Sequence, residues 1–305
     1  MTAAALDTGR ATRRHRNSRE PQGVLLAMAA PAVFVFLFFN IGPLLAVFYL
    51  SLTSYQGMLS TPEFIGLANF RRMFTDPLFW EAGRITAIQM VILLPVLMPL
   101  SYMLGYYLST KPRFVGLLRV NLFAPALISV AAKAMVFFAI LAPTGILNGA
   151  LNSIGLEGLT RAWLANPDTA LACIIFINLW NGVGYTAVLF NARLSSIPDD
   201  VLAAAEIDGA QHWDKMWRIC FPMAKGYFGI LTMLQFLWIL FTSATDILLL
   251  TRGGPGRATT TWSYLLYDRA FNASQIGYSQ ALGVVLFVLG VLGIIVIRRV
   301  FRPTY

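Results

Sequence analysis

The chain has 305 residues, of which 57% are hydrophobic and 12% charged, and its formal net charge at pH 7 is +9. Soluble globular proteins carry about 25% charged residues, so this composition excludes an ordinary soluble domain. The basic residues flank long apolar runs and do not form a basic surface interleaved with aromatic residues, which excludes a nucleic-acid-binding protein. Apolar runs of about 20 residues are long enough to cross a bilayer as helices. The sequence therefore predicts an all-α integral membrane protein.

The N-terminal segment, residues 1–23, is basic and has no apolar periodicity. The apolar run that follows, Val24 to Leu50, is far longer than the core of about 7–15 residues in a cleaved secretory signal. We therefore expect it to be retained as the first span. This divides the chain into a basic tail at 1–23 and a membrane domain at 24–305.

Six membrane spans are expected from the apolar runs. Several prolines lie within or near these runs, and neighbouring helices of a membrane bundle can tolerate them. The expected spans are residues 24–51, 83–108, 116–142, 169–192, 226–250 and 276–297.

The distribution of Lys and Arg predicts the orientation, because cytoplasmic loops carry an excess of both. Fifteen of the 23 basic residues fall on one side, in the two tails, in the loops at 109–115 and 193–225 and at Arg119 near the start of the third span, whereas seven fall on the other side and Lys133 lies inside a span. Both tails and the loop at 193–225 are thus expected in the cytoplasm. On the outer side, Phe64 to Phe70 followed by Arg71, Met73 and Phe74 indicates a short amphipathic helix at the interface. The stretch 251–258, TRGGPGRA, is expected to be a loop.

The cytoplasmic loop at 193–225 reads RLSSIPDDVLAAAEIDGAQHWDKMWRICFPMAK. Pro198 followed by two aspartates is typical of a helix start, and the residues to Ile207 are good helix formers. Gly209 can adopt the left-handed conformation that ends a helix. A second helix is expected from Ala210 to Ile219, ending before Pro222. The sequence thus predicts a helix–glycine–helix element on the basic side of the membrane.

This element resembles the EAA loop of bacterial ABC-transporter permeases, whose pattern is Glu-Ala-Ala, three residues, Gly, nine residues, Ile, two residues, Pro. The residues at the matching spacing are Ala204, Ala205, Asp208, Gly209, Ala210, Ile219 and Pro222. Three further motifs resemble the carbohydrate-importer branch, in particular the larger maltose and glycerol-phosphate permease subunits. They are FIGLANF at 64–70, GILN at 145–148 and TRGGP at 251–255.

The resemblance implies the six-span fold of a type I ABC importer permease in a bacterial plasma membrane. It also implies a cytoplasmic ATPase dimer, a second six-span permease and an extracytoplasmic solute-binding protein as partners, alongside membrane lipid, with alternating access as the mechanism. The loop would then be a coupling helix seated in a cleft of the ATPase. Ala203 stands where the family has Glu, and Glu206, about one turn along, could replace that Glu in an ion pair with the ATPase.

Polar side chains inside the spans are the candidates for a solute pathway. A charge at the bilayer centre costs about 2.5–3.5 kcal/mol on insertion scales, so Lys133 should face the bundle or reach the interface, and Asp246 could pair with it. The amide and aromatic candidates are Asn178, Trp180, Asn181, Tyr185, Gln235 and Trp238. Contacts between helices and interfacial anchoring explain each of these residues equally well when it is taken alone.

The sequence contains no GxxxxGK[ST] phosphate loop, no HExxH and no GxSxG motif. His15 and His212 lie in polar segments, and Cys173 and Cys220 form no CxxC pair, so we expect no metal, cofactor or catalytic site. ATP hydrolysis is then expected from a separate subunit. The alternatives are an ion-coupled secondary transporter, which usually has acidic residues within its spans, and an intramembrane enzyme or scaffold. Genes for a binding protein, an ATPase and a second permease close to the gene for this chain would distinguish an ABC importer permease from these alternatives.

Overall fold

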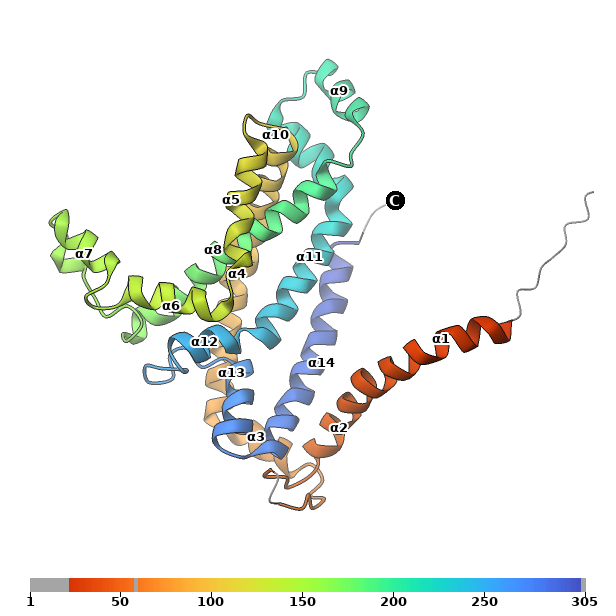
Figure 1. The fold of residues 1–305 in the computed structure, drawn as a ribbon, viewed down its shortest axis with the longest axis vertical. Coiled ribbons are helices and arrows are strands. Elements are labelled where there is room, and N and C mark those ends of the chain that lie inside the picture. Colours follow the sequence, from red (N-terminus) through yellow and green to blue (C-terminus); the bar gives the residue numbers. More distant parts are fainter. Residues whose placement is uncertain (1–21, 58–59, 303–305) are drawn as a thin grey trace, which may run out of the picture. The chain divides into compact units, whose positions relative to one another are not determined.

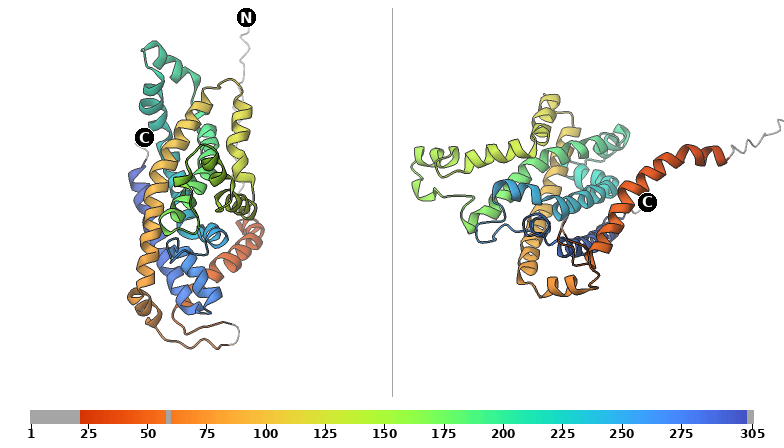
Figure 2. Two further views of the ribbon diagram at one scale, coloured as in Figure 1. Left: turned by 90° about the vertical axis from the view of Figure 1, so that its left-hand side faces the viewer. Right: turned by 60° about the horizontal axis from the view of Figure 1, so that its bottom comes forward.

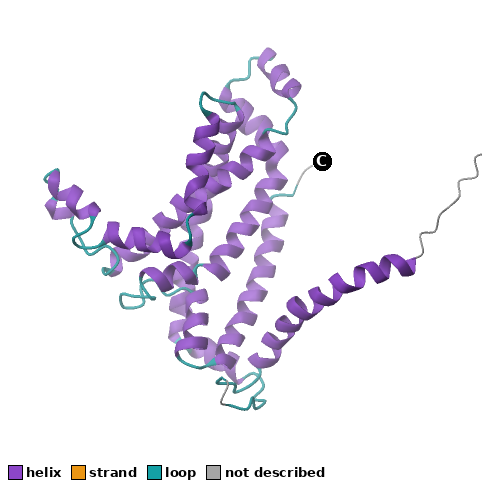
Figure 3. Ribbon diagram, in the orientation of Figure 1, coloured by secondary structure: helices purple, strands orange, loops and turns teal. Residues whose placement is uncertain are grey.

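The computed structural model describes residues 22–57 and 60–302, so His15 and most of the basic tail lie outside the described residues. The described chain is almost entirely helical (Figures 1 and 3). It forms two compact units, the first ending at Ala46 and the second beginning at Val47. The helical elements are α1 Gln22–Phe36, η1 Leu37–Ile41, α2 Gly42–Ser51, α3 Ala68–Thr75, α4 Pro77–Ser109, α5 Val115–Leu127, α6 Val130–Leu141, α7 Ile146–Ser153, η2 Glu157–Leu159, α8 Pro167–Leu194, α9 Asp199–Ile207, α10 His212–Asp214, η3 Lys215–Cys220, α11 Phe221–Thr242, α12 Ala244–Leu250, α13 Trp262–Tyr267, η4 Asp268–Asn272 and α14 Ile276–Val300.

Six helices in the described part of the chain are long and apolar enough to cross a membrane, which agrees with the expected number of spans. The third of them is Val130–Ser153 and not 116–142, and the fifth is His212–Thr242 and not 226–250. The first unit contributes α1, the π-helical turn η1 and the start of α2. These elements carry apolar residues on all sides, which suits contact with lipid or with other spans.

The core of the second unit is built on α4 and α8, which pack along much of their length, with α11 against α4 and α14 and with α5 against α8. Tyr102 of α4 is fully buried at the centre, and its ring meets Phe190 of α8 edge to face at 5.5 Å. Its hydroxyl donates a 2.6 Å hydrogen bond to the carbonyl of Met216 in η3. Gly105 lets α4 and α8 approach closely, because a Cβ there would lie 2.5 Å from the Phe190 Cβ.

Two of the expected spans are broken, which corrects the sequence prediction. The segment 116–142 is divided at Ile128 and Ser129 into α5 and α6, and the Ser129 hydroxyl caps the second piece by accepting from the amide of Ala132 at 3.2 Å. The segment 226–250 is divided at Ser243, which is fully buried and whose hydroxyl lies 2.8 Å from that of Ser263. In both places a serine side chain forms a hydrogen bond at the point where the helix is interrupted.

Two boundaries outside the membrane also differ from the expectation. The second span begins at Pro77 and not near residue 83, because the Asp76 side chain accepts from the amide of Leu78 at 2.9 Å and starts α4 there. The amphipathic helix begins only at Ala68, since Gly66 has φ +60° and Phe64 forms a β-bridge with Thr53. The stretch 251–258 is confirmed as a loop, with positive φ at Arg252, Gly253, Gly256 and Arg257.

The loop at 193–225 is confirmed in its first half only. The helix α9 ends before Gly209, which has φ +79°. The second helix does not end before Pro222, however, because α10, η3 and α11 run on as one helix from His212 to Thr242. The π-helical segment Lys215–Cys220 ends two residues before Pro222, and such a segment can accommodate a residue that lacks an N–H donor.

Candidate functional site

The helix α9 lies at one end of the second unit, and the C-terminal end of α14 points toward that same end, whereas α3 lies at the opposite end (Figures 1 and 2). The turn that follows α4 also lies at the α9 end. Three of the segments that the distribution of Lys and Arg assigns to one side, the loops at 109–115 and 193–225 and the C-terminal end of α14, therefore lie at one end of this unit, whereas the N-terminal tail lies outside the described residues.

The coupling-loop candidates fall into exposed and buried groups. Ala203, Ala204, Glu206, Asp208 and Gly209 are exposed, whereas Ala210, Ile219 and Pro222 are half-buried. Ala205 is 9% exposed and faces the rest of the chain, so the three alanines do not form one outward face. The sequence reasoning missed Ile207 and Trp213, which are 88% and 61% exposed at the tip of the loop. The sequence could have indicated both residues, because they are large apolar residues in a polar segment outside the spans.

Glu206 does not stand free to replace the missing Glu of the family pattern. Its carboxylate forms an ion pair with Lys215 at 3.1 Å across the Gly209 turn. The carboxylate is 73% exposed and Lys215 only 12%, so solvent screens this pair and it contributes little to stability. It does connect α9 to η3.

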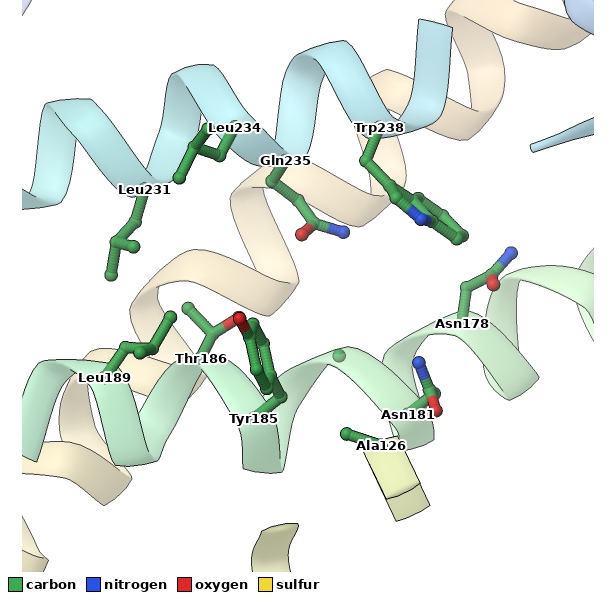
Figure 4. A pocket seen from close by; sticks show the side chains of 11 residues that line it. Ala126, Asn178, Asn181, Tyr185, Thr186, Leu189, Leu231, Leu234, Gln235 and Trp238 are labelled. Carbon is green, nitrogen blue, oxygen red and sulfur yellow. The ribbon is translucent and has the colours of Figure 1, made fainter. Parts of the chain in front are cut away.

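A cavity of about 320 Å³ lies among α5, α8 and α11. Gln235 and Trp238 project from α11 toward the α8 residues (Figure 4). Five of the eight predicted pathway residues line the cavity, together with residues that the sequence reasoning did not select. The lining consists of Ala126, Asn178, Asn181, Gly182, Tyr185, Thr186, Leu189, Leu231, Leu234, Gln235 and Trp238.

Helical spacing explains why the polar residues share this cavity. Asn178, Asn181 and Tyr185 follow one another at three and four residues along α8, and Gln235 and Trp238 are three apart on α11, so each set lies on one helix face. Asn178 is 2% exposed, and neither its amide nitrogen nor its amide oxygen has a hydrogen-bond partner within the described residues. A buried amide without a partner costs about 1–3 kcal/mol. The cavity can thus supply amide donors and acceptors beside aromatic rings.

The other three candidates lie outside this cavity. Trp180 packs edge to face on Phe137 of α6, with ring centroids 5.2 Å apart. Lys133 of α6 and Asp246 of α12 form an ion pair with their nearest N and O atoms 3.6 Å apart, and their side chains are 4% and 3% exposed. The second carboxylate oxygen of Asp246 has no partner among the described residues. The pair joins α6 to α12, the second pieces of the two broken spans.

The comparisons with known proteins identify the family. Residues 97–303, more than half of the chain, match the model for the binding-protein-dependent transport system inner membrane component. The chain belongs to this family. It is 33% identical over 258 residues to the probable ABC transporter permease protein YurN of Bacillus subtilis strain 168, covering 84% of this chain and 88% of that one. It is 30% identical to the lactose transport system permease protein LacF of Rhizobium radiobacter, covering 79% of this chain and 81% of that one.

The fold of this permease is shared with a solved importer. A chain of a bacterial ABC transporter involved in the import of the acidic polysaccharide alginate superposes with a TM-score of 0.80 at 22% identity, covering 93% of this chain and 96% of that one. The predicted all-α fold of an ABC importer permease is thereby confirmed. The family match and the relatives also confirm the predicted role, the transmembrane permease subunit of an ABC importer.

Proposed function

We propose that this permease forms the path for a sugar or sugar-like solute and that the cavity among α5, α8 and α11 is part of that path. The observation that carries the proposal is the buried, unpartnered amide of Asn178 in a cavity that also holds Gln235, Tyr185 and Trp238. Amides exchange hydrogen bonds with hydroxyl groups, and aromatic faces pack on the C–H face of a sugar ring. Relatives named for lactose and for multiple sugars agree with this solute class.

In this proposal the solute reaches the cavity from an extracytoplasmic binding protein, and a second six-span permease completes the path. A separate cytoplasmic ATPase dimer hydrolyses ATP and docks on α9. The exposed tip residues Ile207 and Trp213 support that docking site, because burying one large apolar side chain contributes about 1.5–3 kcal/mol. Since Glu206 is engaged with Lys215, apolar insertion and not an ion pair from Glu206 would hold α9 in the ATPase.

Both chain termini are cytoplasmic in this proposal. The support is the excess of Lys and Arg in the segments that gather at the α9 end of the second unit. An ion-coupled secondary transporter is not favoured, because Asp246, the acidic residue on α12, is already paired with Lys133.

The test is a reconstituted transporter containing this chain, its ATPase, its second permease and its binding protein. ATPase stimulation and uptake are measured with a panel of mono-, di- and oligosaccharides and glycerol phosphates. Asn178→Leu and Gln235→Leu should weaken solute interaction about two- to tenfold per lost hydrogen bond, with basal ATP hydrolysis unchanged. Asn121→Leu is the control, because that amide is exposed and bonds within its own helix to the Leu117 carbonyl. Unchanged uptake in both cavity variants, or no response to any sugar, would reject the proposal.

A further inference from the structure

A second concave site lies on another face of α11 and is entirely apolar. It is a groove of about 390 Å³ between α4 and α11, within the size range of about 300–1,000 Å³ typical of ligand pockets. The walls include Pro95 and Pro99 of α4 together with Phe221 and Phe228 of α11. None of these residues lines the polar cavity described above.

Aromatic rings line the groove at the end nearer to α9. The rings of Trp217 in η3 and Phe221 are tilted by 55° with centroids 5.6 Å apart, and the ring of Phe301, which follows α14, lies 5.2 Å from that of Phe228. Phe301 can approach because residue 229 is glycine, and a Cβ there would meet the Phe301 Cβ at 2.6 Å. This end of the groove is therefore formed by aromatic residues from two segments of the chain, the helix His212–Thr242 and the residue that follows α14.

Two basic residues lie close in sequence to these aromatic residues. Lys225 lies four residues after Phe221 and three before Phe228, which puts it on the same face of α11 as the groove, and it is half-buried. Arg302 directly follows Phe301 and is exposed. Neither basic residue forms an ion pair with any described residue. The acidic residue nearby in sequence, Asp214, is already paired with Arg218 at 3.1 Å.

We propose that this groove binds an anionic phospholipid, with one acyl chain between α4 and α11 and the phosphate at Lys225 and Arg302. An apolar groove beside two positive charges that have no ion-pair partner among the described residues matches the two halves of such a lipid. Anionic lipids are concentrated in the cytoplasmic leaflet, and basic pockets between spans on that side bind their head groups. The inference goes beyond the proposed solute path, and its one link to the proposed function is that the α9 end is cytoplasmic.

The experiment uses the full chain purified with its partner subunits in nanodiscs of phosphatidylcholine containing a few per cent of the probe. The probe is phosphatidylglycerol with brominated acyl chains, which quenches tryptophan fluorescence on contact. Subtracting the signal of Trp217→Phe isolates the tryptophan that lines the groove. Quenching of Trp217 should saturate at low probe content, and brominated phosphatidylcholine should not reproduce it. Both leaflets carry the probe, so this result does not depend on the proposed orientation or solute.

The variant Lys225→Gln with Arg302→Gln should need at least about tenfold more probe for half-maximal quenching, because each basic residue near the surface strengthens the binding of an anionic lipid about fivefold. Arg113→Gln is the matched control, since that basic residue belongs to the same side but lies outside the groove. Raising the salt concentration on the unmodified chain should weaken quenching in the same way, and this needs no variant to fold. Equal quenching by the two lipids, or no effect of the paired substitution, overturns the proposal. The proposal is also overturned if cross-linking shows that Trp217 contacts the second permease and not lipid.

Discussion

The buried ion pair between α6 and α12 allows a quantitative prediction. Lys133 and Asp246 have their nearest charged atoms 3.6 Å apart and are almost inaccessible to solvent. Removing one partner of a buried pair costs about 3–5 kcal/mol, because the remaining charge is left uncompensated. The second oxygen of Asp246 has no partner among the described residues, so no other side chain is placed to take over. Lys133→Met should therefore lower the free energy of unfolding by about 3–5 kcal/mol.

The same reasoning predicts partial recovery when both charges are removed. Replacing a buried pair by uncharged side chains of similar volume is often close to neutral, so Lys133→Met with Asp246→Asn should be more stable than Lys133→Met alone. The assay is equilibrium unfolding in mixed micelles titrated with a denaturing detergent, with solute uptake as the second measurement. The coupling energy from this double-mutant cycle should lie within about 0.5–3 kcal/mol, the range for residues in contact.

Additive losses in the cycle would refute this account of the pair. Non-contacting sites usually add within about 0.3–0.5 kcal/mol, so a double mutant at the sum of the single losses would mean that the two charges do not stabilise each other. Lys133→Arg is the control that retains the positive charge. A large loss in this control would point to packing around Lys133 instead of charge.

Three further predictions concern the coupling loop, the packing of α5 and the topology. Gly209→Val, at φ +79°, should leave membrane abundance unchanged but reduce co-purification of a tagged ATPase and abolish uptake. The control Gly155→Val, at φ +76° in a loop outside the 193–225 segment, should reduce neither co-purification nor uptake. Equal co-purification of the ATPase with both variants would mean that the 193–225 loop is only a connector. Gly184→Ala places a Cβ against the Leu122 carbonyl and should destabilise the chain by about 1–3 kcal/mol in a thermal-stability assay, while Gly149→Ala, which meets nothing within 4 Å, should be close to neutral. Cysteines introduced in the two chain tails should resist an impermeant thiol reagent added to intact cells; labelling of either tail from outside contradicts the proposed topology.

The spans could be predicted because hydropathy depends on local composition, but the interruption at Ser243 could not. Ser243 lies within a continuous apolar run, and its hydrogen bond reaches Ser263, 20 residues along the chain. No local pattern encodes that partner. Ser129, by contrast, bonds to the amide three residues ahead, and the nearby Pro125 was a usable signal for the break in the third span.

The polar cavity could be predicted where polar residues recur at the spacing of one helix face. Asn178 and Tyr185 share a face of α8, but Trp180 is displaced from Asn178 by about 200° around the helix, since each residue turns about 100°. It consequently packs on Phe137 outside the cavity. The suggested use of Glu206 as a substitute for Ala203 overlooked Lys215, which the Gly209 turn returns to within 3.1 Å of that carboxylate.

The uninterrupted helix from His212 to Thr242 has a mechanical consequence. His212 stands beside the tip of the coupling loop, and Gln235 borders the polar cavity; at 1.5 Å per residue they are about 35 Å apart along one axis. The Tyr102 hydrogen bond to the Met216 carbonyl holds this rod near one end and can serve as its fulcrum. If α9 docks the ATPase as proposed, a small displacement of His212 would then move Gln235 and Trp238 at the other end of the helix. The docking end and the side chains that border the cavity are therefore carried by the same helix, with the π-helical segment Lys215–Cys220 and Pro222 lying between them.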